Sequence, residues 1–85
     1  MNKRMVWTRR ALADFDRLDR PVRQQIIEAL ERFAETGYGD IQPLKGTDGE
    51  SRLRVGRWRV RLIEDNAENV IHIQRVLHRS EAYRR

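Results

Sequence analysis

The segment that decides the fold runs from Ser51 to Arg61 and reads S-R-L-R-V-G-R-W-R-V-R. We expect Gly56 and Arg57 to form a two-residue type II′ hairpin turn, because glycine is favoured at the first central position of that turn. The strands that flank the turn then pair residue by residue. The predicted pairs are Val55 with Trp58, Arg54 with Arg59, Leu53 with Val60, and Arg52 with Arg61.

Side chains alternate between the two faces of a strand, which gives this hairpin one apolar and one cationic face. The apolar face consists of Leu53, Val55, Trp58 and Val60, and the cationic face of Arg52, Arg54, Arg59 and Arg61. Trp58 is therefore expected in the core rather than as a platform for a stacked base. Like charges that face each other destabilise a sheet, so four arginines on one face indicate a polyanionic partner.

The composition is that of a small basic domain. The 85 residues are expected to form one domain over residues 1–85, and 18 Lys and Arg against 13 Asp and Glu give a formal charge of +5. Every one of those cations except Lys3 and Lys45 is arginine, which binds phosphate through a planar two-pronged contact that lysine lacks. A nucleic-acid contact is the expected use of this charge.

Several classes of site are excluded by the sequence. The chain has no cysteine, which removes disulfides, thiol catalysis and Cys-ligated zinc. His72 and His78 are the only histidines, and their six-residue spacing matches no metal motif, so neither a metal nor a cofactor is predicted. No apolar run approaches the roughly 20 residues of a membrane span, and no signal-peptide pattern opens the chain. We therefore predict a cytoplasmic protein without a membrane partner.

A short strand and a first helix are predicted ahead of the hairpin. The strand is the apolar run Met5–Trp7, and Thr8 is placed to cap the helix that follows. That helix runs from Arg9 to Leu18, with apolar residues at helical spacing. Asp14 falls between the apolar positions and is expected on the solvent side.

A second helix is predicted after Asp19, which is a good N-cap, and Gly37 ends it. The connection is short, so the two helices form an antiparallel hairpin. The segment Tyr38–Glu50 contains several glycines and a proline and is expected to be a loop. The apolar stripe of the second helix consists of Val22, Ile26, Ala29, Leu30 and Phe33.

The last part of the chain predicts one more strand and a polar tail. The second hairpin strand continues through Ile63, a turn follows at Asp65–Glu68, and Asn69–Leu77 reads as a strand. Its alternation is imperfect, which indicates a bulge near Arg75. The order β-α-α-β-β-β predicts an α+β fold, with a two-helix hairpin packed on one face of a small, mainly antiparallel sheet. The cationic face of the hairpin is then open to solvent.

Taken together, these segments resemble the RelE/ParE toxin superfamily of bacterial toxin–antitoxin systems. The resemblance rests on A-L-A-D-F-D-R-L at residues 11–18, on P-L-K-G followed by R-L-R-V-G-R-W-R-V within residues 43–60, and on H-R-S-E-A-Y-R at residues 78–84. These motifs have the family's order and spacing, and the match covers nearly the whole chain. The resemblance implies a RelE-like fold and the toxin component of a type II toxin–antitoxin system.

The RelE branch of this superfamily consists of endoribonucleases that cut messenger RNA in the ribosomal A site and are silenced by a co-expressed antitoxin. The resemblance therefore implies mRNA, the ribosome and a cognate antitoxin protein as partners. ParE-type toxins, which inhibit DNA gyrase without catalysis, share the fold but generally lack the full set of catalytic residues. They remain the alternative, and a basic nucleic-acid-binding module without toxicity is a third reading.

The resemblance also assigns site residues one by one. The family keeps two basic residues on the strand before the turn, matched here by Arg52 and Arg54, and an arginine just after the turn, matched by Arg59. Near the C-terminus it keeps an arginine and a tyrosine, matched by Arg79 and Tyr83. Arg54, Arg59, Arg79 and Tyr83 are the expected catalytic residues, and Arg52 is expected to bind substrate.

Three further residues are candidates for substrate binding. Lys45 lies beside Gly46 and suits a phosphate contact, and Arg61 shares the cationic face but is equally suited to pair with a carboxylate. His78 could take part in catalysis, although a structural hydrogen bond is the commoner role. Tyr83 could likewise be a packing residue at the C-terminal end.

One departure from the family concerns the first hairpin strand, where the best-known RelE toxins carry lysines and this chain carries Arg52 and Arg54. Cleavage of RNA without metal by its own 2′-hydroxyl needs a proton acceptor, a proton donor and charge stabilisation on the phosphorus. Arginine keeps its proton and can only stabilise charge. Proton transfer is then expected to depend on Tyr83, on His78, or on the ribosome and the substrate.

Overall fold

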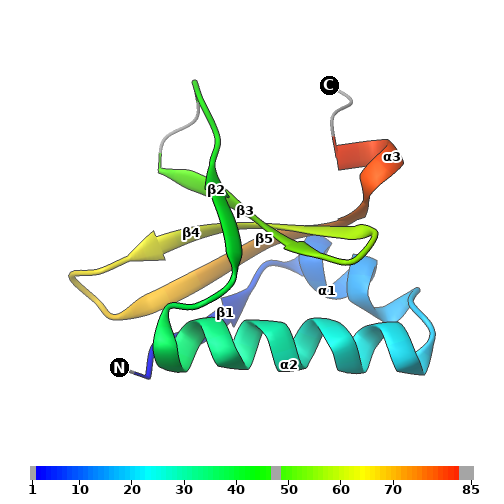
Figure 1. The fold of residues 1–85 in the computed structure, drawn as a ribbon, viewed down its shortest axis with the longest axis horizontal. Coiled ribbons are helices and arrows are strands. Elements are labelled where there is room, and N and C mark those ends of the chain that lie inside the picture. The colour runs from blue at the N-terminus through cyan, green and yellow to red at the C-terminus, as the bar shows by residue number, and fades with distance from the viewer. Residues whose placement is uncertain (1, 47–48, 83–85) are drawn as a thin grey trace.

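The computed structural model describes residues 2–46 and 49–82, and within them five strands form one sheet. The sheet order is β1-β5-β4-β3-β2; β1 is parallel to β5 and the other neighbours are antiparallel. Figure 1 shows α1 and α2 on one side of the sheet, and α3 beyond the end of β5 on the other. The elements are β1 (Arg4–Trp7), α1 (Arg9–Asp16), α2 (Arg20–Thr36), β2 (Asp40–Pro43), β3 (Glu50–Val55), β4 (Trp58–Asp65), β5 (Val70–His78) and α3 (Arg79–Ala82).

The β3–β4 hairpin has the predicted register in every pair, from Val55 opposite Trp58 to Arg52 opposite Arg61. Gly56 has a φ of +59°, and among the described non-glycine residues only Asn69 has a positive φ. One positive φ at the first central position is typical of a type II′ turn, because a type I′ turn needs two. The turn residues therefore set the register of the central strands.

Both predicted helices form, with the predicted caps. The Thr8 hydroxyl accepts a hydrogen bond from the Ala11 backbone N–H, and the Asp19 carboxylate accepts one from Val22. Gly37 caps the end of α2. The α1 helix ends at Asp16, two residues before the predicted boundary, which is within the usual uncertainty of helix ends.

The core lies between the helix pair and one face of the sheet. Val55 and Trp58 pack against it as partly buried side chains, so Trp58 has the core position expected for it. The apolar stripe of α2 packs at the centre of this core. The buried core residues are Ala11, Ile26, Leu30, Phe33, Ala34, Leu53, Val60, Leu62, Ile71, Ile73 and Val76.

The predicted bulge in the last strand is present. Arg61 pairs with Arg75 and Leu62 pairs with Ile73, so Gln74 is the extra residue on β5. The extra residue resets the alternation of side chains, which places both Ile73 and Val76 in the core although they are three residues apart.

The prediction that Tyr38–Glu50 is entirely loop is wrong, because Asp40–Pro43 forms the edge strand β2 and pairs antiparallel with β3. Its only partly buried residue is Ile41, so the strand lacks the hydrophobic alternation by which strands are found in sequence. The polar tail was also expected without an element, and it contains the short helix α3.

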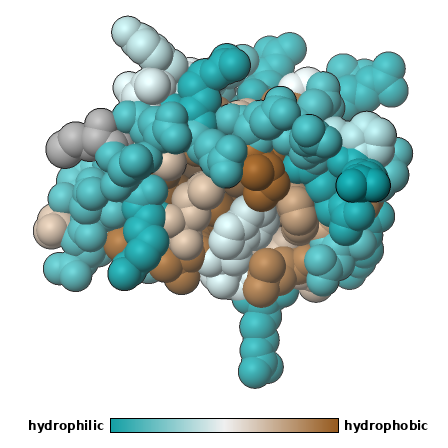
Figure 2. All heavy atoms as spheres, turned by 90° about the horizontal axis from the view of Figure 1, so that it is seen from below, coloured by the Kyte–Doolittle hydropathy of each residue, from teal (hydrophilic) through white to brown (hydrophobic). Residues whose placement is uncertain are grey.

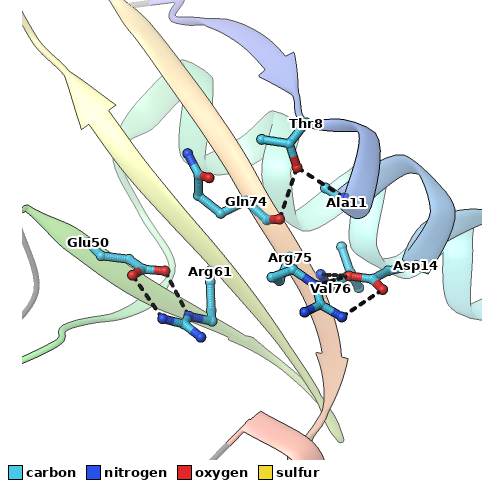
Figure 3. A network of polar contacts seen from close by, with 8 residues as sticks. All are labelled: Thr8, Ala11, Asp14, Glu50, Arg61, Gln74, Arg75 and Val76. Atoms are coloured by element: carbon cyan, nitrogen blue, oxygen red, sulfur yellow. Dashed lines mark hydrogen bonds and ion pairs between the residues drawn. The ribbon is translucent and has the colours of Figure 1, made fainter. Parts of the chain in front are cut away.

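The prediction that Asp14 faces solvent is wrong as well, because its side chain is 7% exposed. The strand β1 ends at Trp7, so β5 has no strand neighbour on this edge beyond Ile73, and α1 lies there instead. The Asp14 carboxylate accepts hydrogen bonds from the Val76 backbone N–H at 2.9 Å and from Arg75 Nε and Nη2 at 2.8 and 3.1 Å (Figure 3). It thereby satisfies a strand-edge donor that would otherwise be buried without a partner.

No helix among the described residues is both long and apolar enough to cross a membrane.

Candidate functional site

Three of the predicted site residues line a small hollow on the face of the sheet opposite to α2. The hollow, called here the arginine hollow, is formed by β2, β3 and β4. The Arg54 Nε lies 3.8 Å from the Asp40 carboxylate, and the Arg52 Nη2 donates to the Gln42 side-chain oxygen at 3.4 Å. The residues that line the arginine hollow are Asp40, Gln42, Arg52, Arg54 and Arg59.

Arg54 is the most accessible cation of this hollow. Its side chain is 63% exposed, and the Asp40 side chain that it faces is 66% exposed. An ion pair at this separation and exposure contributes little free energy. Arg54 can therefore exchange Asp40 for another anion at small cost.

Arg59 occupies a different environment from the one predicted. It is 7% exposed, and its Nη1 donates hydrogen bonds of 2.9 Å to the backbone carbonyl oxygens of Gly56 and Trp58. The expectation that all four arginines of this face are open to solvent is thus wrong for Arg59. Its guanidinium stabilises the hairpin turn, and it borders the hollow at the same time.

Arg61 pairs with a carboxylate, which was one of its two predicted roles. Its Nε and Nη2 donate to the two oxygens of Glu50 at 2.7 and 2.9 Å (Figure 3). The Glu50 side chain is only 13% exposed and that of Arg61 is 31% exposed. This bidentate contact fixes the guanidinium in one orientation.

Two of the residues predicted near the C-terminus, His78 and Arg79, lie beside the hairpin turn rather than in the arginine hollow. The Arg79 backbone N–H donates to the Arg57 carbonyl oxygen at 2.8 Å, which attaches the start of α3 to the turn. The His78 ring packs edge-on against Trp58, with 5.3 Å between centroids, and its Nδ1 lies 2.9 Å from the Ser80 hydroxyl. These contacts match the structural role considered for His78.

The two remaining predicted residues are Lys45 and Tyr83. Lys45 is exposed in the turn after β2 and is not among the residues that line the arginine hollow. Tyr83 lies outside the described residues. Its proposed role therefore stays a prediction.

The chemistry available in the arginine hollow is anion binding and charge stabilisation. Its three arginines and Asp40 sum to a formal charge of +2. No histidine lines the hollow, so the described side chains offer it no group that is poised to exchange a proton near neutral pH. Among the described residues, no group of His, Cys, Asp and Glu is arranged to hold a metal ion.

Asp40 and Gln42 are site residues that sequence reasoning missed. Both belong to β2, which was predicted as loop. They alternate on one face of that strand, opposite Arg54 and Arg52 respectively. The one available signal was a polar residue at every second position, which is weak over four residues.

Comparison with known proteins identifies the family to which the chain belongs. Residues 5–83 match the family described as the ParE toxin of the type II toxin–antitoxin system, parDE. A search of curated proteins gave no match.

Solved structures share the fold at low sequence identity. A RelBE toxin–antitoxin complex from Mycobacterium tuberculosis matches with a TM-score of 0.81 and 21% identity, covering 92% of this chain and 99% of that one. A RelE–RelB complex from Pyrococcus horikoshii gives 0.79 and 20%, covering 96% and 100%. The isolated RelE toxin of E. coli gives 0.78 and 21%, covering 95% and 90%. At identities this low the structural likeness shows the fold alone, and that fold is RelE-like α+β, as predicted.

Proposed function

We propose that this chain, which belongs to the ParE toxin family of type II toxin–antitoxin systems, is an endoribonuclease toxin that cuts messenger RNA and so inhibits translation. The observation that carries the proposal is the arginine hollow, where Arg52, Arg54 and Arg59 converge on one small space. Guanidinium groups around a phosphate stabilise the charge that develops when a 2′-hydroxyl attacks the phosphorus. In this proposal the ribosome positions the messenger RNA for cleavage.

The four catalytic candidates take separate roles in the proposal. Arg54 binds the scissile phosphate in place of Asp40, because its present ion pair is long and exposed. Arg59 stiffens the wall of the hollow through the turn carbonyls and directs its remaining donors to the same phosphate. Arg79 neutralises charge at the leaving 5′-oxygen. Tyr83 orients the 2′-hydroxyl or, as a phenolate, accepts its proton, and the ribosome or the solvent supplies a proton to the leaving oxygen.

A second candidate function is inhibition of DNA gyrase without catalysis. Two observations favour it: the family match is to a ParE toxin, and no histidine lines the arginine hollow. Arginines that bind and stabilise but exchange no proton are sufficient for a protein that acts only by binding.

Induction of the protein in bacteria, followed by mapping of transcript ends, separates the two functions. Cuts within translated codons are the expected result. The variant Arg54→Ala should lower cleavage by about 10²–10³-fold, as the loss of one preorganised charge does in other enzymes. Arg32→Ala is the matched control, because Arg32 is exposed on α2, on the far side of the sheet.

Two results would refute the nuclease. Intact transcripts together with induction of the DNA-damage response would assign the chain to gyrase inhibition instead. Normal cleavage by Arg54→Ala would show that the arginine hollow is not the reaction site.

We also propose that a cognate antitoxin covers the helix side of the molecule. Figure 2 shows apolar residues gathered in the middle of this side and surrounded by hydrophilic ones. Leu12 on α1 is 46% exposed, and a hollow beside α1 and α2 includes Phe15 and Ile27. With a formal charge of +5 on the chain, an acidic and partly disordered partner suits this surface.

The antitoxin proposal is tested by co-purification with the product of a neighbouring small acidic reading frame. Leu12→Asp should weaken that complex, whereas Tyr38→Asp should not, because Tyr38 is exposed just after the C-terminal end of α2, and α1 connects to the other end of that helix. Equal effects of the two substitutions would contradict the assignment of the helix side.

A further inference from the structure

A second and larger hollow opens on the same face of the sheet as the arginine hollow. It lies between the start of α1 and the strands β3 to β5, and its volume is about 510 Å³. Figure 3 shows this region, with the side chains of Glu50, Arg61 and Arg75 next to one another across three strands. The lining residues are Thr8, Arg9, Arg10, Glu50, Arg61, Gln74 and Arg75.

Two of the four lining arginines are held rigidly. Arg61 and Arg75 face each other across β4 and β5, and each makes a bidentate contact with its own carboxylate. Glu50 binds Arg61 through Nε and Nη2, and Asp14 binds Arg75 through the same two atoms. Each contact uses two of the five N–H donors of a guanidinium. The remaining donors are already fixed in space, so a ligand would lose little side-chain entropy on binding them.

The other two lining arginines, Arg9 and Arg10, carry charge without an acidic partner. Both are exposed in the first turn of α1, and no carboxylate among the described residues pairs with either of them. The four arginines with Glu50 and Asp14 sum to a formal charge of +2. Glu50 lies in the hollow itself, but both of its oxygens are engaged by Arg61.

The two hollows are joined through β4. Arg59 borders the arginine hollow and Arg61 borders the second one, and they are two residues apart on the same strand. Alternate residues of a strand are about 7 Å apart, which is comparable to the distance between successive phosphates of an extended nucleic-acid strand. A chain with a phosphate in one hollow can therefore reach the other without a break.

We propose that the second hollow is a phosphate-binding site for the same single-stranded RNA whose scissile phosphate lies in the arginine hollow, with Arg9 and Arg10 as its main contacts. This inference rests on the proposed function, because it takes the arginine hollow as the reaction site. The second hollow holds the strand at a distance from the cleaved bond, so it contributes to binding and not to the chemical step.

The test measures binding of a fluorescent oligouridylate of about ten nucleotides with 2′-O-methyl groups, which cannot be cut, over about 50–200 mM salt. Each phosphate contact to a single strand contributes about 0.7 to the slope of log K against log salt concentration. The double variant Arg9→Gln/Arg10→Gln should therefore lower the slope by about 1.4. The matched control Arg20→Gln/Arg32→Gln removes the same charge from exposed positions of α2 and should leave the slope nearly unchanged.

An unchanged slope in Arg9→Gln/Arg10→Gln, or an equal loss in the control, would overturn the proposal. A competition experiment with polyglutamate, at the same concentration of charge as the oligonucleotide, gives a second way to overturn it. If polyglutamate displaced the oligonucleotide from wild type but not from Arg9→Gln/Arg10→Gln, the hollow would bind acidic protein segments equally well.

Failure of the proposed function gives a different result. A protein that leaves transcripts intact but shows the predicted loss of slope refutes the nuclease and keeps the site. A protein that cuts transcripts normally with Arg9→Gln/Arg10→Gln and shows no loss of slope keeps the nuclease and refutes the site.

Discussion

Replacing Asp14 by asparagine removes the charge from a carboxylate that connects α1 to β5. The asparagine oxygen can take the place of Oδ2 and accept from the Val76 backbone N–H and from Arg75 Nε. The amide nitrogen then lies at the place of Oδ1 and faces the Nη2 donor of Arg75, which loses its acceptor. Hydrogen bonds to charged groups contribute about 1.5–3 kcal/mol each, and we expect Asp14→Asn to lower the free energy of unfolding by about 2–3 kcal/mol. In a domain of this size that loss corresponds to a decrease of roughly 10–20 °C in Tm.

The same carboxylate makes this stability dependent on pH. Burial raises the pKa of Asp14, but hydrogen bonds from Arg75 and Val76 and the positive charges of Arg75 and Arg17 outweigh it, and the pKa lies below its ordinary value of 3.8. For a carboxyl group with a lowered folded-state pKa, the stabilisation is complete above the unfolded pKa and is lost as pH falls through the folded one. The difference between wild type and Asp14→Asn should thus be constant near neutral pH and shrink below about pH 4.

Urea unfolding at a series of pH values measures both effects. The matched control is Asp16→Asn, on the same helix but exposed, and it should change the free energy of unfolding by less than about 0.5 kcal/mol. Equal stability of Asp14→Asn and wild type at pH 7 would refute the assigned role of Asp14. A difference between them that persists unchanged to pH 2 would show that its charge is not the cause.

Three further outcomes are expected. Arg59→Ala should lower the free energy of unfolding by about 1–3 kcal/mol, because the turn loses two charged hydrogen bonds, and an unchanged urea midpoint would contradict this. Gly39→Ala should destabilise by about 1–3 kcal/mol, since its Cβ would lie 2.8 Å from Leu53 Cδ1; additive effects with Leu53→Val in a double-mutant cycle would argue against that contact. Tyr83→Phe should reduce RNA cleavage by about 10²–10⁴-fold with oligonucleotide binding unchanged, and full activity would remove Tyr83 from the catalytic set.

The central hairpin and the two helices could be predicted because their signals are local. Gly56 sets a turn geometry that few other residues tolerate, and the register of both strands follows from it. Thr8 and Asp19 satisfy backbone N–H groups within three residues of themselves. Such interactions depend on neighbours in sequence, so a single sequence is enough to find them.

The missed features depend on partners far away in sequence. Asp14 is buried because β1 ends early and leaves Val76, 62 residues further along the chain, without a strand neighbour on that edge of β5. Asp40–Pro43 becomes a strand because β3 has an open edge beside it. Neither segment carries a hydrophobic period that would distinguish it from a solvent-exposed helix face or a loop.

The candidate site was predicted at the level of residue type and position, but not of environment. Alternation along a strand shows that Arg52, Arg54, Arg59 and Arg61 share a face. It cannot show that Arg59 is buried by its own turn, or that Arg61 is bound by Glu50. Those contacts form because hydrogen bonds to carbonyl or carboxylate oxygens offset the repulsion between neighbouring guanidinium groups, and the position of those oxygens depends on the whole fold.

These environments divide the cationic face by the strength with which each arginine is held. Arg59 and Arg61 are fixed by short contacts to protein oxygens, and Arg54 is held only by a long, exposed pair. Fixed cations give a surface its shape and field at no cost when a ligand binds. A loosely paired one can move with the ligand and is the cation to which an incoming phosphate has the readiest access. If the face binds RNA, affinity should therefore be spread over its arginines, whereas the effect on cleavage should be larger for Arg54 than for Arg61.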